Sequence, residues 1–98
     1  MTIEDCTEVA AIDRVCFLKA WSVAMFEDTL QFPMYHYYVA VSCREEPISK
    51  EMIVGFAGIM ESVDAADIMN IGVLPEYRRQ GIGKALFQKL EMQAKSSN

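Results

Sequence analysis

The sequence contains few of the residues that build metal sites or disulfide frameworks. Its 98 residues include one histidine, His36, and three cysteines, Cys6, Cys16 and Cys43, with no C-x-x-C spacing. A zinc site needs several such ligands at close spacing, so no metal site is expected. The cysteines are predicted to be free thiols in a reducing cytosol, which indicates a cytoplasmic location.

The chain also lacks long apolar runs and an excess of basic residues. No stretch approaches the roughly 20 apolar residues of a membrane span, and no signal peptide is expected before the first helix. The net charge of -5 argues against nucleic acid as the main partner and would suit a basic peptide or protein. Neither a membrane nor nucleic acid is therefore predicted as a partner. With 52% hydrophobic and 23% charged residues, residues 1–98 are expected to form a single globular domain.

Capping residues and hydrophobic spacing predict two helices, three strands and a final helix. Thr2 is a candidate N-cap of a first helix that ends near Phe17. Ser22 is a candidate N-cap of a second helix, which Pro33 closes. The other predicted elements are strands over residues 35–42, 52–62 and 67–73, a polar turn over 43–51, and a helix over about 81–95.

This order, ααβββα, predicts an α/β fold in which helices flank a mainly antiparallel sheet. Gly55 and Gly58, inside the second strand, mark a bulge or a close approach of another group to the backbone. The final helix carries an apolar stripe of residues spaced four apart, which should face the sheet: Ile82, Leu86, Leu90 and Ala94.

The strongest functional signal lies over residues 70–86, where a β-branched strand leads through Pro75 into a glycine-containing helix start. The loop reads Arg78-Arg79-Gln80-Gly81-Ile82-Gly83 and is followed by Lys84. The first backbone N–H groups of a helix have no partners within it, and the helix dipole favours negative charge there. Glycines let a ligand approach this backbone, and the basic side chains add positive charge. The pattern predicts a phosphate or pyrophosphate site.

Two common nucleotide-binding motifs do not fit this loop. A dinucleotide motif needs a third glycine, but Lys84, Ala85 and Leu86 follow Gly83. A P-loop needs glycine where Arg78 stands and a hydroxyl where Ala85 stands. These positions exclude both a dinucleotide-binding motif and a P-loop.

The loop instead resembles the acyl-CoA-binding motif of the GNAT N-acetyltransferase superfamily, [Gln/Arg]-x-x-Gly-x-[Gly/Ala]. The resemblance continues on both sides and covers nearly all of the chain in the family's order, so a partial GNAT fold is expected. The segments most similar to its ribosomal-protein-alanine N-acetyltransferase branch are residues 64–73 and 75–77, Cys16-Phe17, Trp21-Ser22, Phe26 and residues 37–40.

The resemblance implies an enzyme that uses acetyl-CoA as co-substrate, without a metal. The acetyl group would pass to the amine of a protein or peptide N-terminus, with a ribosomal protein as a candidate acceptor. Backbone at the end of the third strand would contact pantetheine and the acetyl group, and main-chain amides of the loop would hold the pyrophosphate. The implied cofactor-binding residues are Ile71, Gly72, Val73, Arg78, Arg79, Gln80, Gly81, Ile82, Gly83 and Lys84.

The chain departs from the family pattern at both ends. It lacks a strand before the first helix, and it lacks the elements after the motif helix that hold the branch's general base and acid. The catalytic residues are therefore unknown, and Glu61 and Asp64, at a strand end expected near the cleft, are the candidates for a substitute base. The alternative function is a non-catalytic CoA-binding fragment or half-domain that needs another polypeptide for activity. The third strand, residues 67–73, would have an open apolar edge, which predicts self-association.

Two aromatic features have more than one interpretation. Trp21 could line an acceptor-peptide groove, as the resemblance suggests, or pack in the core between two amphipathic helices. Tyr35, Tyr37 and Tyr38 lie on one strand, where side chains alternate between faces. At least one of these tyrosines is expected to be buried and one exposed.

Overall fold

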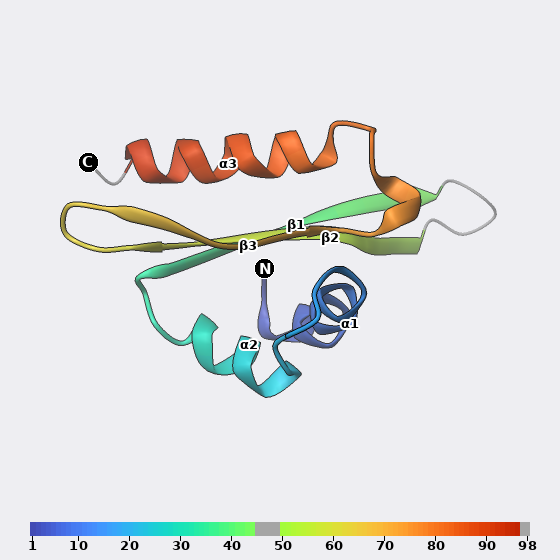
Figure 1. The fold of residues 1–98 in the computed structure, drawn as a ribbon, viewed down its shortest axis with the longest axis horizontal. Coiled ribbons are helices and arrows are strands. Elements are labelled where there is room, and N and C mark those ends of the chain that lie inside the picture. The colour runs from blue at the N-terminus through green and yellow to red at the C-terminus, as the bar shows by residue number, and fades with distance from the viewer. Residues whose placement is uncertain (45–49, 97–98) are drawn as a thin grey trace.

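The computed structural model describes residues 1–44 and 50–96, which form three layers (Figure 1). The middle layer is an antiparallel sheet in the order β1-β2-β3. Helices α1 and α2 lie on one face of the sheet and α3 lies on the other (Figure 1), so the predicted α/β fold and element order are confirmed. The bounds are η1 Ile3–Asp5, α1 Cys6–Cys16, α2 Val23–Leu30, β1 Tyr35–Arg44, β2 Lys50–Glu61, β3 Ala66–Val73, η2 Pro75–Tyr77 and α3 Ile82–Ser96.

Short-range signals set the helix starts. The Ser22 hydroxyl accepts a hydrogen bond of 3.2 Å from the Met25 N–H, so Ser22 is the N-cap of α2 as predicted. At the other predicted cap, the Thr2 N–H donates to Asp5 Oδ2 at 2.8 Å. This contact opens the 3-10 turn η1, which runs directly into α1. The first regular helix therefore starts a turn later than Thr2 alone suggests.

Most of the predicted turn over residues 43–51 falls on 45–49, outside the described residues. Its flanks belong to the strands, because Arg44 pairs with Lys50 at the ends of β1 and β2. Both strands therefore run two residues further than the sequence pattern predicts.

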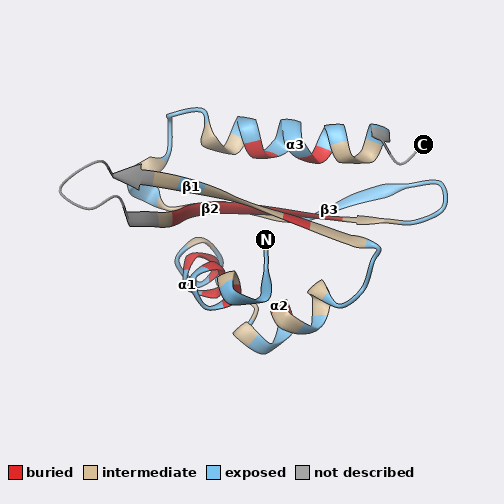
Figure 2. Cartoon of the chain, turned by 180° about the vertical axis from the view of Figure 1, so that it is seen from behind, coloured by how far each residue is buried: buried red, intermediate tan, exposed pale blue. Residues whose placement is uncertain are grey.

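The sheet divides the core into two clusters, and its central strand β2 is buried on both faces (Figure 2). Under α1 and α2, the Phe26 and Phe56 rings pack edge to face with their centroids 5.7 Å apart. On the opposite face, Leu86 and Leu90 of the predicted α3 stripe are 5% and 1% exposed. They pack with Ala57, Ile59 and Val73.

The predicted close approach at Gly58 is confirmed. A Cβ on this glycine would lie 2.1 Å from Cζ of Tyr37, because the tyrosine ring covers its backbone. Tyr37 is buried, whereas Tyr35 and Tyr38 are both half-buried. The expectation of an exposed tyrosine was wrong, since Tyr35 packs on the core under the helices and Tyr38 lies under α3.

Candidate functional site

A cavity of about 450 Å³ lies where three elements end or begin. The carboxyl end of β3, the carboxyl end of α1 and the loop before α3 form its walls. Eight of the ten predicted cofactor-binding residues line it: Ile71, Gly72, Val73, Arg78, Arg79, Gly81, Gly83 and Lys84. Tertiary structure thus brings the strand end and the glycine loop to one site.

The loop backbone has the shape that its glycines suggest. Gly81 has φ 82° and Arg79 has φ 66°, so both lie in the left-handed region. That region is free to glycine but sparsely populated by other residues, and strained positions of this kind cluster at ligand sites. A Cβ on Gly81 would meet no protein atom within 4 Å. The space beside this glycine is therefore open to a ligand.

The loop delivers the start of α3 to the cavity. The Ala85 N–H donates to the Gly81 carbonyl at 2.9 Å, and this is the first hydrogen bond of the helix. The amides of Ile82, Gly83 and Lys84 precede that bond, at the end of the helix where the dipole is positive. Such amides bind phosphate oxygens well.

The charge around the cavity is opposite in sign to that of the chain. Arg78, Arg79 and Lys84 line it, and among the described lining residues none is acidic. The whole chain carries a net charge of -5. The cavity is therefore a local basic site that would concentrate an anionic ligand.

Two predicted site residues turn their side chains elsewhere. The Gln80 side chain donates to the Glu76 carbonyl at 3.5 Å. Ile82 packs on the apolar cluster under α3. Both residues can still offer backbone amides, which is the contact that the resemblance implies for them.

Cys16 and Phe17 also line the cavity, although they are not among the cofactor-binding residues predicted from the sequence. Cys16 Sγ lies 3.5 Å from the Val73 carbonyl oxygen. The two cysteines whose side chains are described, Cys6 and Cys16, are free thiols. The signal for this wall of the cavity was the Cys16-Phe17 pair within the family resemblance, but only the packing of α1 against β3 places it there.

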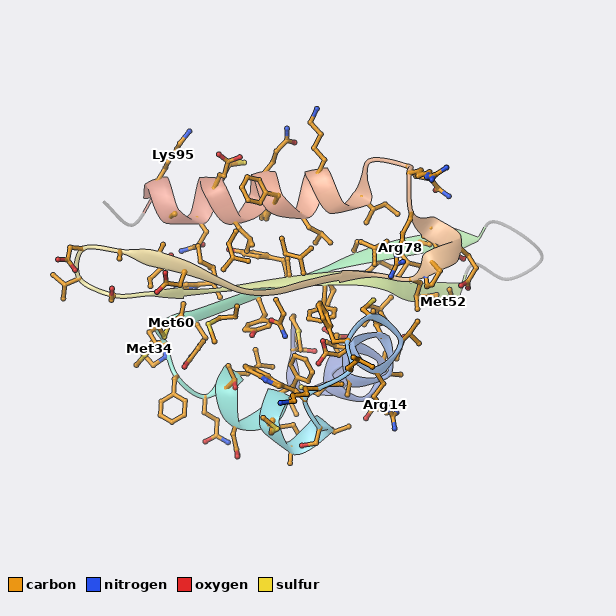
Figure 3. All side chains as sticks on the ribbon, viewed as in Figure 1. Arg14, Met34, Met52, Met60, Arg78 and Lys95 are labelled. Atoms are coloured by element: carbon orange, nitrogen blue, oxygen red, sulfur yellow. The ribbon has the colours of Figure 1, made fainter. Side chains whose placement is uncertain are left out.

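Glu61 and Asp64 are not near this cavity, so the expectation that they lie beside the cleft was wrong. Gly55 pairs with Val73 next to the cavity, whereas Glu61 pairs with Ala66 six residues further along β2. At about 3.4 Å per residue this is about 20 Å. Figure 3 shows Met60 and Arg78 toward opposite ends of the sheet. Glu61 instead lies 3.6 Å from His36, measured from Oε1 to Nε2.

Trp21 packs against the core under α1 and α2, as the second of its two interpretations predicts. It is half-buried, and its ring centroid lies 5.2 Å from that of Phe26 and 6.5 Å from that of Tyr37. Its backbone N–H donates to Asp13 Oδ2 at 2.7 Å. Asp13 is 2% exposed, and burial raises the pKa of its carboxyl while the Trp21 hydrogen bond opposes that rise.

The described part of the chain also shows no sign of a metal site or a membrane-spanning helix. No group of three or more His, Cys, Asp and Glu residues there lies close enough to hold a metal ion. None of its helices combines the length and apolar character needed to cross a bilayer.

Comparison with known proteins identifies the class. The family model for the GNAT acetyltransferases matches residues 6–98. A curated relative, the putative [ribosomal protein bS18]-alanine N-acetyltransferase of Bacillus subtilis, is 33% identical over 90 residues. That alignment covers 90% of this chain and 54% of the relative, so the chain spans about half the length of the curated protein it matches.

Solved structures agree on the fold. The ribosomal-protein-S18-alanine N-acetyltransferase from Escherichia coli superposes with a TM-score of 0.69 at 24% identity, over 95% of this chain and 57% of the other. An acetyltransferase of Trypanosoma brucei gives a TM-score of 0.68 at 22% identity, over 98% of this chain and 72% of the other. The chain belongs to the GNAT acetyltransferase family.

Proposed function

We propose that this chain binds acetyl-CoA in the cavity between β3 and the start of α3. We further propose that it serves transfer of the acetyl group to a protein N-terminal amine of the ribosomal-protein-alanine type. The observation that carries the proposal is the basic cavity itself, which joins a strand end to a glycine-rich helix start. The proposal includes a cytoplasmic location, where acetyl-CoA and ribosomal proteins are both found.

The two halves of CoA match the two halves of the cavity. The pyrophosphate would lie against the amides of residues 79–84, beside the open space at Gly81 and the positive end of α3. The pantetheine arm would run along the backbone of residues 71–73, at the other wall of the same cavity. The thioester would then sit at the end of β3, where backbone N–H groups can polarise its carbonyl.

Holding the thioester in line with an amine would supply much of the rate, because binding removes the entropy cost of bringing two molecules together. The amine must also lose a proton and the leaving thiolate must gain one. Among the described residues that line the cavity, none is a carboxylate, a histidine or a tyrosine. This observation favours the second candidate function, a CoA-binding half-domain that needs another polypeptide for turnover.

Titration calorimetry with CoA tests binding, and two lysines of α3 give a matched pair of variants. Lys84→Glu reverses a charge in the cavity, yet an acidic residue in the first turn suits the helix dipole, so the fold should be kept. Lys95→Glu makes the same change near the far end of α3 (Figure 3). We expect the first variant to weaken CoA binding about tenfold or more and the second by less than about twofold. Equal losses, or no binding by the unaltered chain, would refute the proposal.

Release of free CoA from acetyl-CoA, measured in the presence of a ribosomal-protein N-terminal peptide, distinguishes the two candidate functions. The half-domain predicts tight binding with little or no turnover by the chain alone. Robust turnover would instead show that the chain contains its own base. A variant Glu61→Gln should leave such turnover unchanged, because Glu61 lies at the other end of β2 from the site.

A further inference from the structure

The side chain of Arg78 turns back toward the sheet instead of extending along the glycine loop (Figure 3). Its Nε donates to the Val73 carbonyl at 3.0 Å. Its Nη2 lies 3.5 Å from Cys16 Sγ. One guanidinium therefore connects the loop before α3 to the ends of both β3 and α1.

The peptide unit between Val73 and Leu74 is held at both of its polar groups. Its carbonyl oxygen, that of Val73, accepts a hydrogen bond from Arg78 Nε. Cys16 Sγ lies 3.5 Å from the same oxygen. Its N–H, which belongs to Leu74, donates to the Val54 carbonyl of β2 at 2.9 Å. Two opposed hydrogen bonds fix the plane of this peptide, and with it the direction in which the end of β3 faces the cavity.

We propose that Arg78 is a positioning residue for the pantetheine half of the CoA site and acts through the Val73 peptide. This inference rests on the proposed function. The planar guanidinium suits the role, because its donors have fixed directions and it can hold two acceptors at once. Phosphate binding is left to Arg79, Lys84 and the amides of the helix start, which line the rest of the cavity.

Two ligands separate this role from a direct phosphate contact. CoA contains both the phospho-ADP half and the pantetheine arm. Free phospho-ADP carries the phosphates without the pantetheine arm. A residue that positions the end of β3 should affect CoA and leave phospho-ADP unchanged. A residue that contacts the pyrophosphate, or one that merely keeps the loop folded, should affect both ligands alike.

The test is calorimetry of both ligands with Arg78→Met, which removes the donors, and Arg78→Lys, which keeps the charge without the fork. Arg14→Met is the control, because Arg14 is an exposed arginine of α1 that points into solvent (Figure 3). We expect both Arg78 variants to bind CoA about tenfold more weakly and phospho-ADP within about twofold. The control should match the unaltered chain with both ligands.

Three binding results overturn the inference. Retained CoA binding in Arg78→Lys with parallel loss of both ligands in Arg78→Met would make Arg78 a phosphate contact. Unchanged binding of both ligands by both variants would mean that Arg78 has no role in binding CoA. Equal affinity of the unaltered chain for CoA and phospho-ADP would mean that the end of β3 contributes nothing. If Arg78→Met fails to fold, Arg78→Lys alone still shows whether CoA binding depends on the positive charge of residue 78, which lysine keeps, or on the planar guanidinium, which lysine lacks. Failure of the unaltered chain to bind either ligand would reject the proposed function as well.

Discussion

The Tyr37 hydroxyl on β1 donates a hydrogen bond of 2.8 Å to Asn70 Oδ1 on β3. The two strands are not neighbours, because β2 lies between them. Gly58 of β2 pairs with Tyr37 on one side and with Asn70 on the other, so the side chain crosses the sheet directly over this glycine. The contact ties both outer strands together three residues before Val73, the last residue of β3 and a wall of the cavity.

Gly58→Ala should be strongly destabilising. The added Cβ would lie 2.1 Å from the Tyr37 ring, so the ring must leave its position and the crossing contact must break. Overpacking of a core usually costs about 1–3 kcal/mol, and the lost hydrogen bond adds to that. Urea unfolding measures the change. The control is Gly83→Ala, whose Cβ would lie 3.9 Å from Val73, an ordinary contact. Similar stabilities for the two variants would contradict the prediction.

Tyr37→Phe should cost about 1–2 kcal/mol, because it leaves Asn70 without its donor and keeps the ring packing. Burial also raises the pKa of the Tyr37 phenol. In the unfolded chain a tyrosine loses its proton near pH 10, whereas the folded Tyr37 keeps it, so stability should fall as the pH rises above that value. Unfolding curves across alkaline pH should show a shallower fall for the Phe variant. An unchanged slope would mean that the phenol is not the group responsible.

Asp13→Asn should raise stability at neutral pH. Asp13 Oδ1 has no hydrogen-bond partner among the described residues, and burial raises the pKa of this carboxyl. The folded state therefore holds its proton at pH values where the unfolded state has lost it. Stability from this group is present at low pH and is lost as the pH rises from the unfolded pKa, near 3.9, through the folded one. The asparagine keeps an acceptor for the Trp21 N–H and does not titrate.

The Asp13 prediction is measured as the free energy of unfolding against pH. Asp13→Asn should flatten the curve in the acidic range, whereas Asp13→Ala should lower stability at every pH because it removes the Trp21 acceptor. An asparagine variant less stable than the unaltered chain at neutral pH would show that the ionised carboxylate is stabilising.

Self-association through β3 remains a prediction. In the described part of the chain β3 pairs with β2 alone, and Ile68 and Met69 beside its free edge are 48% and 36% exposed. An open apolar edge of this kind pairs readily with another strand. Light scattering should show species larger than a monomer, and Ile68→Lys should shift them toward monomer. Val63→Lys, at a residue 101% exposed, is the control and should change little.

CoA should oppose this association. Residues 71–73 lie on β3 and also line the cavity, so a bound pantetheine arm and a paired strand would compete for the same backbone. Ligand that binds only the monomer must shift the equilibrium toward it. Light scattering with saturating CoA therefore tests whether the two surfaces overlap. A stable monomer without ligand would refute the prediction of self-association.

Features that depend on residues close together in the chain could be predicted from the sequence. Ser22 caps α2 because its hydroxyl reaches an N–H three residues away. The four-residue spacing from Ile82 to Ala94 sets the face of α3 that packs on the sheet, because the helical repeat brings those side chains together. The glycine loop before α3 is predictable for the same reason, since the amides that start a helix are consecutive in the chain and Gly81 takes the left-handed conformation there.

Contacts between residues far apart in the chain depend on the register of the sheet and on the packing of the helices. Glu61 and Asp64 looked close to the site along the chain, but the antiparallel pairing of β2 and β3 carries them to the other end of the sheet. The same pairing places Gly58 under Tyr37 and brings Asn70 within reach of it. Cys16 reaches the cavity, and Arg78 reaches Val73, only because α1, β3 and the loop pack together. The sequence by itself determined which local structures form and which loop carries the glycine and basic residues of the proposed phosphate site. Tertiary structure alone decided which distant side chains meet there, because those contacts depend on register and packing that no short-range spacing encodes.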